Sequence, residues 1–417
     1  MAEVRGFRAL RFDKNLVGDL DNVVTPPFDV ISPEEREILA ARSPYNYTHV
    51  ILPQERDGLD KYQNASALFE DWIAGGALKQ DDAESFYLLE QHFRSMDGRD
   101  CVRRGFFAVA KIPEPGEGTV LGHERTFDWK VKDRLALTEA TRANLGAVFV
   151  LYDDPRGRLK SFLAQMDERG PDLTATTIDG VTQRVWHVPY DPAVTEFFHG
   201  KRLYIADGHH RYRTAHTHRD RKRLSHRAAE LQPWDFVLMG FVALDDPGLF
   251  VYPAHRVVDA PDGFDAEAFL KSLEPWFEVE PVNADLHARV QAEPNCAIGL
   301  ALRGGRRYLL RLRDIDRVQL LGDEHGPEWR DLDVSVLHGG ILERLMNFPP
   351  DAVFVYEKDP ATAIDLVEKG NKGLAFILRN MRPEQVCACA EAHESMPQKA
   401  TYFFPKLPSG AVIYRLA

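Results

Sequence analysis

Apolar residues along this chain recur at two spacings, one typical of helices and one typical of strands. In residues 59–73 the apolar side chains fall at helical spacing and end at a pair of glycines. Residues 85–93 and 102–112 are instead strand-like and are joined by a turn at Asp97-Gly98. Segments of both kinds alternate along the whole chain, and this alternation predicts a mixed α/β fold.

The pattern starts afresh after about residue 260, at the turn-rich sequence Pro261-Asp262-Gly263. Beyond it, residues 297–313 are typical of a hairpin, and strands then alternate with helices as far as residue 394. This restart predicts one domain over residues 1–260 and a smaller α/β domain over 261–417. The last strands of the second domain could return to a site in the first.

The most informative motif lies at a strand-to-helix turn. Residues 203–205 are strand-like, and Ala206-Asp-Gly-His-His-Arg-Tyr-Arg213 opens a predicted helix. Gly208 would let backbone N–H groups approach an anion, and the helix dipole favours negative charge there. With His209, His210 and Arg211 beside it, the turn suits phosphate binding, proton transfer or both. The competing interpretation is an ordinary turn with solvated histidines.

A second polar cluster runs from residue 122 to residue 134. Its cations Arg125, Lys132 and Arg134 could neutralise phosphates. Its acids Glu124 and Asp133 could accept a proton or hold Mg²⁺. Asp133 could instead cap a helix predicted over residues 133–144, and the lysines could simply be solvated.

Asp29 is a further candidate, because it lies in a stiff turn between a double proline and a helix. Pro26-Pro27 forces an extended path, and Ser32-Pro33-Glu34-Glu35 is a capping box that starts a helix ending near Arg42. Asp29 itself caps nothing in this pattern. It is therefore either a functional carboxylate or an ordinary turn aspartate.

Near the C-terminus, residues 396–406 form an apolar stretch flanked by Lys399 and Lys406. Such a stretch can project a lysine into a neighbouring pocket. It can equally be an edge strand protected from aggregation by lysine and proline.

Composition narrows the function classes. The 417 residues are 44% hydrophobic and carry a formal net charge of −12, which favours a globular protein and argues against general binding to DNA or anionic membranes. The four cysteines are sparse and include no Cys-x-x-Cys pair, so we expect no zinc site and a reducing cytoplasm. The histidines of the turn also lack a metal-binding pattern, and no signal or membrane segment is evident.

These clusters together resemble a widespread family of uncharacterised bacterial and archaeal proteins. The matching stretches are residues 25–32, 123–126, 132–134, 206–213 and 396–406. Members of that family look like relatives of the ParB/sulfiredoxin superfamily, which includes free serine kinases. Residues 208–215 are similar to the ParB nucleotide-binding box, and His209 replaces the cysteine of the sulfiredoxins.

The resemblance implies a ParB/sulfiredoxin-like N-terminal portion in which Asp207, Gly208, His209, His210 and Arg211 hold the phosphates of ATP, ADP or CTP. Combined with the other clusters, it predicts a nucleotide-dependent kinase for a small hydroxylated metabolite such as free serine.

In this scheme His210 and Arg211 offset charge on the transferred group, and Lys132 and Arg134 clamp the nucleotide or the acceptor. Asp29 or Glu124 deprotonates the acceptor hydroxyl, and Mg²⁺ bridges the phosphates.

Two other functions use the same turn. One is a nucleotide-binding or nucleotide-hydrolysing regulator without a small-molecule acceptor. The other is a binding protein whose histidine-rich turn senses an anion or pH. The choice among nucleotides, acceptors, catalytic carboxylates and oligomeric states stays open at this point.

Overall fold

The computed structural model describes residues 2–114, 116–226, 230–349, 352–370 and 372–416. Its contacts divide the chain into two units. The first contains residues 1–122, 126–249 and 405–417, and the second contains residues 123–125 and 250–404. The sequence placed the division after residue 260. In the structure the division comes after Leu249, and the C-terminal segment belongs to the first unit.

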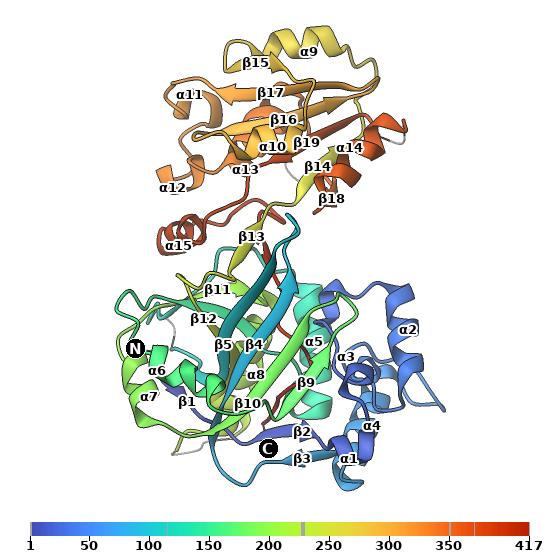
Figure 1. Cartoon of the computed structure of the whole chain (residues 1–417), viewed down its shortest axis with the longest axis vertical. Helices are drawn as coiled ribbons and strands as arrows, with labels where there is room; N and C mark the ends of the chain where they lie inside the picture. Colours follow the sequence, from blue (N-terminus) through green and yellow to red (C-terminus); the bar gives the residue numbers. More distant parts are fainter. Residues whose placement is uncertain (1, 115, 227–229, 350–351, 371, 417) are drawn as a thin grey trace. The chain divides into compact units, whose positions relative to one another are not determined.

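Strands of the first unit form a mixed sheet. Those described are β1 (Val4–Arg5), β4 (Ser85–Arg94), β5 (Asp100–Lys111), β6 (Val120–Leu121), β8 (Val148–Tyr152), β9 (Leu173–Thr176), β10 (Thr182–Pro189), β11 (Leu203–Asp207) and β12 (Phe236–Ala243). Their order is β6-β11-β8-β12-β5-β4-β10-β9, with β1 beside β5 (Figure 1). The pairs β6–β11 and β8–β12 are parallel and the others are antiparallel.

A smaller antiparallel sheet ties the C-terminus into the same unit. It has the order β3-β2-β21-β7 and is built from β2 (Ala9–Phe12), β3 (Leu78–Gln80), β7 (Ala143–Asn144) and β21 (Ile413–Arg415). The bridge between Thr25 and Ser409 extends this contact. The segment from residue 409 to residue 415 therefore pairs with segments near residues 9, 25 and 143.

Helices of the first unit include the two that carry the polar clusters. The described helices are α1 (Lys14–Val17), α2 (Pro33–Arg42), α3 (Thr48–Ile51), α4 (Lys61–Ala74), α5 (Asp128–Thr141), α6 (Lys160–Ala164), α7 (Pro192–Phe198) and α8 (His209–Ser225), with short 3₁₀ turns η1 (Leu20–Asn22), η2 (Phe28–Val30), η3 (Gln165–Asp167) and η4 (Pro233–Asp235). The predicted capping box of α2 is confirmed, because Ser32 and Glu35 bond each other's backbone N–H groups. Helix α5 begins at Asp128 instead of near Asp133, so Asp133 lies inside it and caps nothing.

The core of the first unit is rich in aromatic side chains. Phe106, Phe198 and Phe241 are completely buried, and the rings of Phe106 and Phe241 stack with centroids 4.9 Å apart. Burying one such side chain contributes about 1.5–3 kcal/mol, so this cluster gives the sheet a rigid base. The strand β11, whose end carries the Asp207–Gly208 turn, is anchored in this core by Leu203 and Ile205.

The second unit has a six-stranded antiparallel sheet among its described residues, in the order β15-β17-β16-β19-β14-β18. Its strands are β14 (His255–Val258), β15 (Phe277–Pro281), β16 (Ala297–Leu302), β17 (Arg306–Leu312), β18 (Val355–Glu357) and β19 (Leu374–Leu378), and β13 (Phe250–Tyr252) pairs separately with β20 (Tyr402–Phe404). The helices are α9 (Ala266–Leu273), α10 (Leu286–Gln291), α11 (Val318–Leu321), α12 (Pro327–Arg330), α13 (Asp333–Ser335), α14 (Pro360–Glu368) and α15 (Pro383–Glu391).

The predicted helix over residues 334–346 is present, but most of it is a π-helix and not an α-helix. After α13 it continues as a π-helix, η5 (Val336–Leu345), in which the amide of Met346 bonds the carbonyl of Ile341 at 2.9 Å. Both units thus contain helices and strands, and the predicted mixed α/β class is confirmed.

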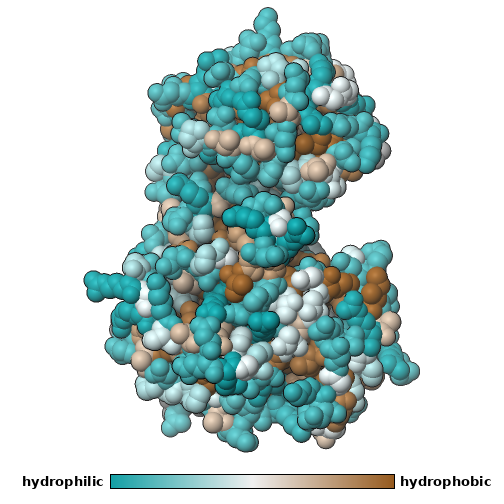
Figure 2. All heavy atoms as spheres, viewed as in Figure 1, coloured by the Kyte–Doolittle hydropathy of each residue, from teal (hydrophilic) through white to brown (hydrophobic). Residues whose placement is uncertain are grey.

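Within the described residues, no helix is long and apolar enough to cross a membrane. The face in Figure 2 is mostly hydrophilic, with apolar residues in small patches.

Candidate functional site

The turn from β11 into α8 requires a glycine. Gly208 has φ 91° and ψ 28°, in the left-handed region that side chains rarely adopt. A Cβ atom there would lie 3.0 Å from Cζ and from Nε of Arg211. The absence of a side chain at position 208 therefore lets the Arg211 guanidinium fold back over the turn.

Arg211 is held by the backbone and by Asp207. Its Nη2 donates to Oδ2 of Asp207 at 2.6 Å, and its Nη1 donates to the carbonyl of Ala147. Its Nε is buried and has no hydrogen-bond partner among the residues that the structure describes. The Oδ2 atom of Asp29 lies 3.9 Å from Nη2. One guanidinium thus contacts a partly buried carboxylate and lies near a more exposed one.

The second oxygen of Asp207 binds a lysine that lies far away in the sequence. Nζ of Lys406 donates to Oδ1 at 2.6 Å, and the two side chains are 8% and 20% exposed. Burial raises the pKa of Asp207, but Lys406 and then Arg211 outweigh it and hold the pKa well below its ordinary value. The buried position of Lys406 favours projection into a site over protection of an exposed strand edge.

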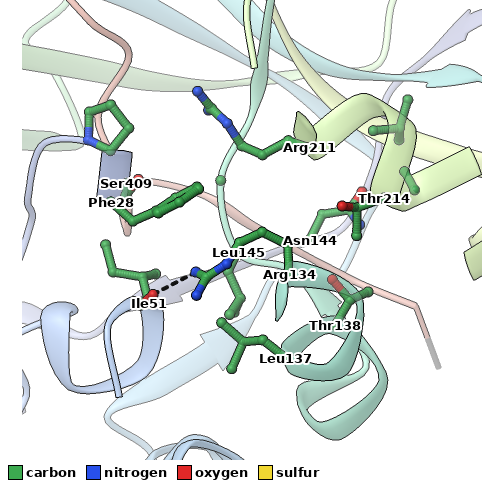
Figure 3. Close-up of a pocket in the computed structure, with 14 residues that line it drawn as sticks. Phe28, Ile51, Arg134, Leu137, Thr138, Asn144, Leu145, Arg211, Thr214 and Ser409 are labelled. Atoms are coloured by element: carbon green, nitrogen blue, oxygen red, sulfur yellow. Dashed lines mark hydrogen bonds between the residues drawn. The ribbon is translucent and has the colours of Figure 1, made fainter. Parts of the chain in front are cut away.

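Beside Arg211 the first unit is hollowed. The hollow is open to solvent, and the space between its lining atoms is about 570 Å³ when that open solvent is included. Figure 3 shows residues that line it. Its walls combine apolar side chains, two arginines and a few small polar groups: Pro27, Phe28, Ile51, Arg134, Leu137, Thr138, Asn144, Leu145, Gly146, Arg211, Thr214, Ala215, Val237 and Ser409. A lining of this kind suits a molecule with an apolar body and an anionic end.

Arg134 forms the second cationic part of the lining. Figure 3 shows it directed at the carbonyl of Ile51, which it bonds at 2.7 Å. Its guanidinium also lies 4.3 Å from the ring centre of Phe28, within cation–π range. These contacts fix Arg134 at the wall of the hollow.

Asp133 is a structural partner of Arg134. It accepts hydrogen bonds from Nζ of Lys61 at 2.7 Å, from the hydroxyl of Tyr62 at 2.8 Å and from Nε of Arg134 at 2.8 Å. Burial raises its pKa, but Lys61 and Arg134 outweigh this and lower the pKa to about 2. Such a group stays ionised and bonded, so it does not suit proton transfer near neutral pH.

Asp29 reaches the site because its backbone is stiff. Pro27 precedes the 3₁₀ turn η2, and Phe28 in this turn lines the hollow. The side chain of Asp29 is 39% exposed, so a solvent-borne hydroxyl group can approach its carboxylate.

His210 acts as a hydrogen-bond acceptor in the structure. Its Nε2 accepts from the backbone N–H of Phe127 at 3.0 Å, and the two rings stack with centroids 6.0 Å apart. An accepting Nε2 places the proton of a neutral imidazole on Nδ1. His209 is 5% exposed and packs closely against Gly122, where a Cβ would lie 2.9 Å from its ring.

The structure gathers part of the predicted set. Asp29, Asp207, Gly208 and Arg211 are adjacent, and Arg134 lines the same hollow as Arg211. The lining includes neither His209 and His210 of the turn nor Lys132 and Glu124. Lys132 is exposed on α5, and Glu124 belongs to the second unit, whereas every lining residue belongs to the first.

Several lining residues were not singled out from the sequence. Helical spacing could have found two of them, because Thr138 is four residues after Arg134 and Thr214 is three residues after Arg211. Phe28 lies in the stretch that carries Asp29. Ser409 has no such signal, since only the return of the C-terminal segment brings it to the hollow.

Metal binding by the protein alone has no support in the part of the chain that the structure describes. No group of three or more histidine, cysteine, aspartate or glutamate side chains could hold an ion there.

One family model matches residues 4–335, and the description of that family is protein of unknown function (DUF1015). No curated protein matches the chain.

Solved structures resemble it distantly. A conserved hypothetical protein from Pyrococcus furiosus is 12% identical, with 73% of this chain and 93% of that chain covered and a TM-score of 0.35. A free serine kinase in complex with AMP is 11% identical, with 71% and 86% covered and a TM-score of 0.34. SbnI with a C-terminal truncation, from Staphylococcus aureus, is 10% identical, with 73% and 86% covered and a TM-score of 0.35. Likenesses this distant carry no information on chemistry.

Proposed function

The chain belongs to the DUF1015 family, and we propose that it is a phosphotransferase that uses a nucleotide to phosphorylate a small hydroxylated metabolite, with free serine as the first candidate. The single observation that carries the proposal is the placement of Arg211. Its guanidinium lines a hollow with largely apolar walls and lies 3.9 Å from the accessible carboxylate of Asp29. A phosphate-binding cation is thereby next to a group that can take a proton.

The residues present fit a nucleotide. Gly208 leaves a cradle that a Cβ would fill, and within the described part of the chain the buried Nε of Arg211 has no hydrogen-bond partner. Guanidinium groups bind phosphate oxygens well, and the start of α8 favours negative charge. The apolar walls and the small polar groups of the hollow suit the nucleoside end. The similarity of residues 208–215 to the ParB box supports the same ligand class.

In the proposed reaction the acceptor hydroxyl oxygen forms a bond to the terminal phosphorus of the nucleotide. The bond between that phosphorus and its bridging oxygen breaks, and the shortened nucleotide leaves with the electron pair. Asp29 takes the hydroxyl proton, and Arg211 offsets the charge that builds up on the phosphate oxygens. His210 supports the turn through its bond from Phe127.

Mg²⁺ would supply charge neutralisation on the phosphates when it is bound. The described residues place two carboxylates near Arg211, and one of them, Asp207, already binds two cations. No group of three or more ligands is present among them, so nucleotide oxygens and water would have to complete the coordination of Mg²⁺. Glu124 is the alternative base from the sequence. The adjacency of Asp29 to Arg211 favours Asp29.

The test is a transfer assay with ATP, ADP and CTP, each with Mg²⁺, against serine and a panel of small alcohols. We expect a phosphorylated acceptor with the wild type and at least about a hundredfold lower rate with Asp29→Asn. Asp179→Asn removes an exposed carboxylate from a hairpin turn of the same unit and should keep the full rate.

Three results would contradict the proposal. The first is that no nucleotide is consumed with any acceptor. The second is equal transfer by the wild type and Asp29→Asn. The third, nucleotide hydrolysis that no acceptor stimulates, would favour a regulatory nucleotide hydrolase.

A further inference from the structure

We propose that Lys406 is a positioning residue for this site, acting through Asp207 to keep the Arg211 guanidinium oriented and to offset the negative charge of the carboxylates beside it, so that the cluster can hold a phosphate group. The inference rests on the proposed function and deepens it. It assigns a role in phosphate recognition to the segment that follows the second unit in the chain.

The geometry of Asp207 supports this role. Its two carboxylate oxygens bind different cations, with Oδ1 accepting from Lys406 and Oδ2 from Arg211, both at 2.6 Å. Because Lys406 occupies Oδ1 of Asp207, Arg211 bonds only Oδ2 and does not form a two-point ion pair with this carboxylate. The second Nη group of Arg211 then bonds the carbonyl of Ala147, which sets the plane of the guanidinium.

Charge supports the same role. Arg211, Asp207 and Lys406 together carry a net charge of +1, which balances the carboxylate of Asp29 3.9 Å from Arg211; without Lys406 the same cluster would carry a net charge of −1. Because the three side chains are at most 20% exposed, water screens this charge weakly. A nearby phosphate would therefore experience the positive charge that Lys406 adds.

Lys406 is itself held in place by the main sheet. Its carbonyl accepts from Nε2 of Gln91 at 2.9 Å, and Oε1 of Gln91 accepts from Nε of Arg103 at 3.0 Å. Arg103 is buried and lies 4.6 Å from the ring centre of Phe149, which pairs in register with Asp207. Strands β4, β5 and β8 thus support both ends of the Lys406–Asp207 contact.

Leu407, the next residue, is buried and packs against strand β12 of the main sheet. Gly240 on β12 leaves space for it, since a Cβ there would lie 2.5 Å from Cδ1 of Leu407. The lysine therefore lies on an anchored stretch of backbone and not on a loose tail.

The experiment compares the binding of nucleotides and nucleosides by calorimetry, using adenosine with ADP and ATP, and cytidine with CTP. In the wild type, the phosphates should strengthen binding over the nucleoside. Lys406→Met should reduce this phosphate-dependent gain by about ten- to a hundredfold and leave nucleoside affinity within about threefold. Lys406→Arg, which keeps the charge, should retain most of the gain.

Lys79→Met is the matched control, because Lys79 pairs with Asp13 elsewhere in the same unit. It should change neither affinity. A purely structural role for Lys406 predicts another pattern, in which nucleoside and nucleotide binding fall together.

If Lys406→Met does not fold, Lys406→Gln keeps a donor for Asp207 without the charge and should show the same selective loss. The inference is overturned if a neutral variant keeps the full phosphate-dependent gain, or if both neutral variants fail to fold. A wild type that binds none of the three nucleotides overturns the proposed function itself.

Discussion

Each unit of this protein contains an arginine whose side chain has little exposure to solvent, and these two arginines, Arg211 and Arg256, are bonded in different ways. In the first unit, Arg211 contacts the carboxylate of Asp207 and lines a hollow. In the second, Arg256 is completely buried and bonds only neutral acceptors that the structure describes: Nε2 of His338 at 3.0 Å, the carbonyl of Gln398 at 2.9 Å and the carbonyl of Ala254.

The surroundings of Arg256 indicate a structural role for this side chain. Burial lowers its pKa to about 10, and burial together with Arg256 lowers the pKa of His338 to about 3. His338 is therefore a neutral acceptor at any physiological pH. The ring centre of Tyr356 lies 5.0 Å from the Arg256 guanidinium. A buried cation by itself does not mark a binding site. Access through a hollow and a nearby carboxylate are what distinguish Arg211.

The strongest test of this contrast is Arg211→Met. The variant removes the cation that lines the hollow and leaves Asp207 with Lys406 alone. We expect nucleotide affinity about 100- to 1000-fold below that of the wild type, measured by calorimetry with ADP, ATP and CTP. Unchanged affinity would show that the hollow does not use this guanidinium.

The matching change in the second unit is Arg256→Met, which should affect stability and not binding. It leaves His338 and two carbonyl groups without their donor. We expect the free energy of unfolding to fall by about 2–3 kcal/mol in urea titrations. Nucleotide affinity should stay within about twofold of the wild type, and a large loss of binding would break the comparison.

A smaller effect should follow from Gly208→Ala. The turn holds the alanine in the left-handed region, and its methyl group displaces the Arg211 guanidinium. We expect the free energy of unfolding to fall by about 1–2 kcal/mol and nucleotide affinity to fall about tenfold. Gly180→Ala is the control, since its φ is 79° but no atom lies within 4 Å of the added Cβ. It should lose stability without losing affinity.

The smallest expected effect is on the pH dependence of stability. It comes from Asp133, the ion-pair partner of a third arginine, Arg134. The pKa of Asp133 is about 2 in the folded protein and about 4 in an unfolded chain. The ionised Asp133 carboxylate therefore stabilises the folded protein fully above about pH 4, and this stabilisation declines as the pH falls towards 2.

Between pH 6 and pH 3, urea titrations should show the wild type losing about 1 kcal/mol more stability than Asp133→Asn. Equal losses in the two proteins would mean that the contacts of Asp133 with Lys61 and Arg134 add little.

Local patterns were enough for much of the fold. The capping box at Ser32 and Glu35 placed the start of α2, because a helix end is fixed by residues close together in sequence. The apolar run at 203–205 and the glycine after it placed the strand-to-helix turn, since both depend on backbone preferences of adjacent residues. The predicted start of α5 was wrong, because the residue before the helix provides no side-chain cap that would mark the true start at Asp128.

The site depended on contacts between residues far apart in sequence. The sequence by itself was enough to predict a turn at Asp207 and Gly208 that suits an anion, because this prediction depends on one short stretch of backbone and side chains. Only the tertiary structure decided that Asp29 lies beside Arg211 and that Lys406 binds Asp207 from 199 positions away. Such contacts are set by sheet pairing and by the return of the C-terminal segment, which no local pattern encodes.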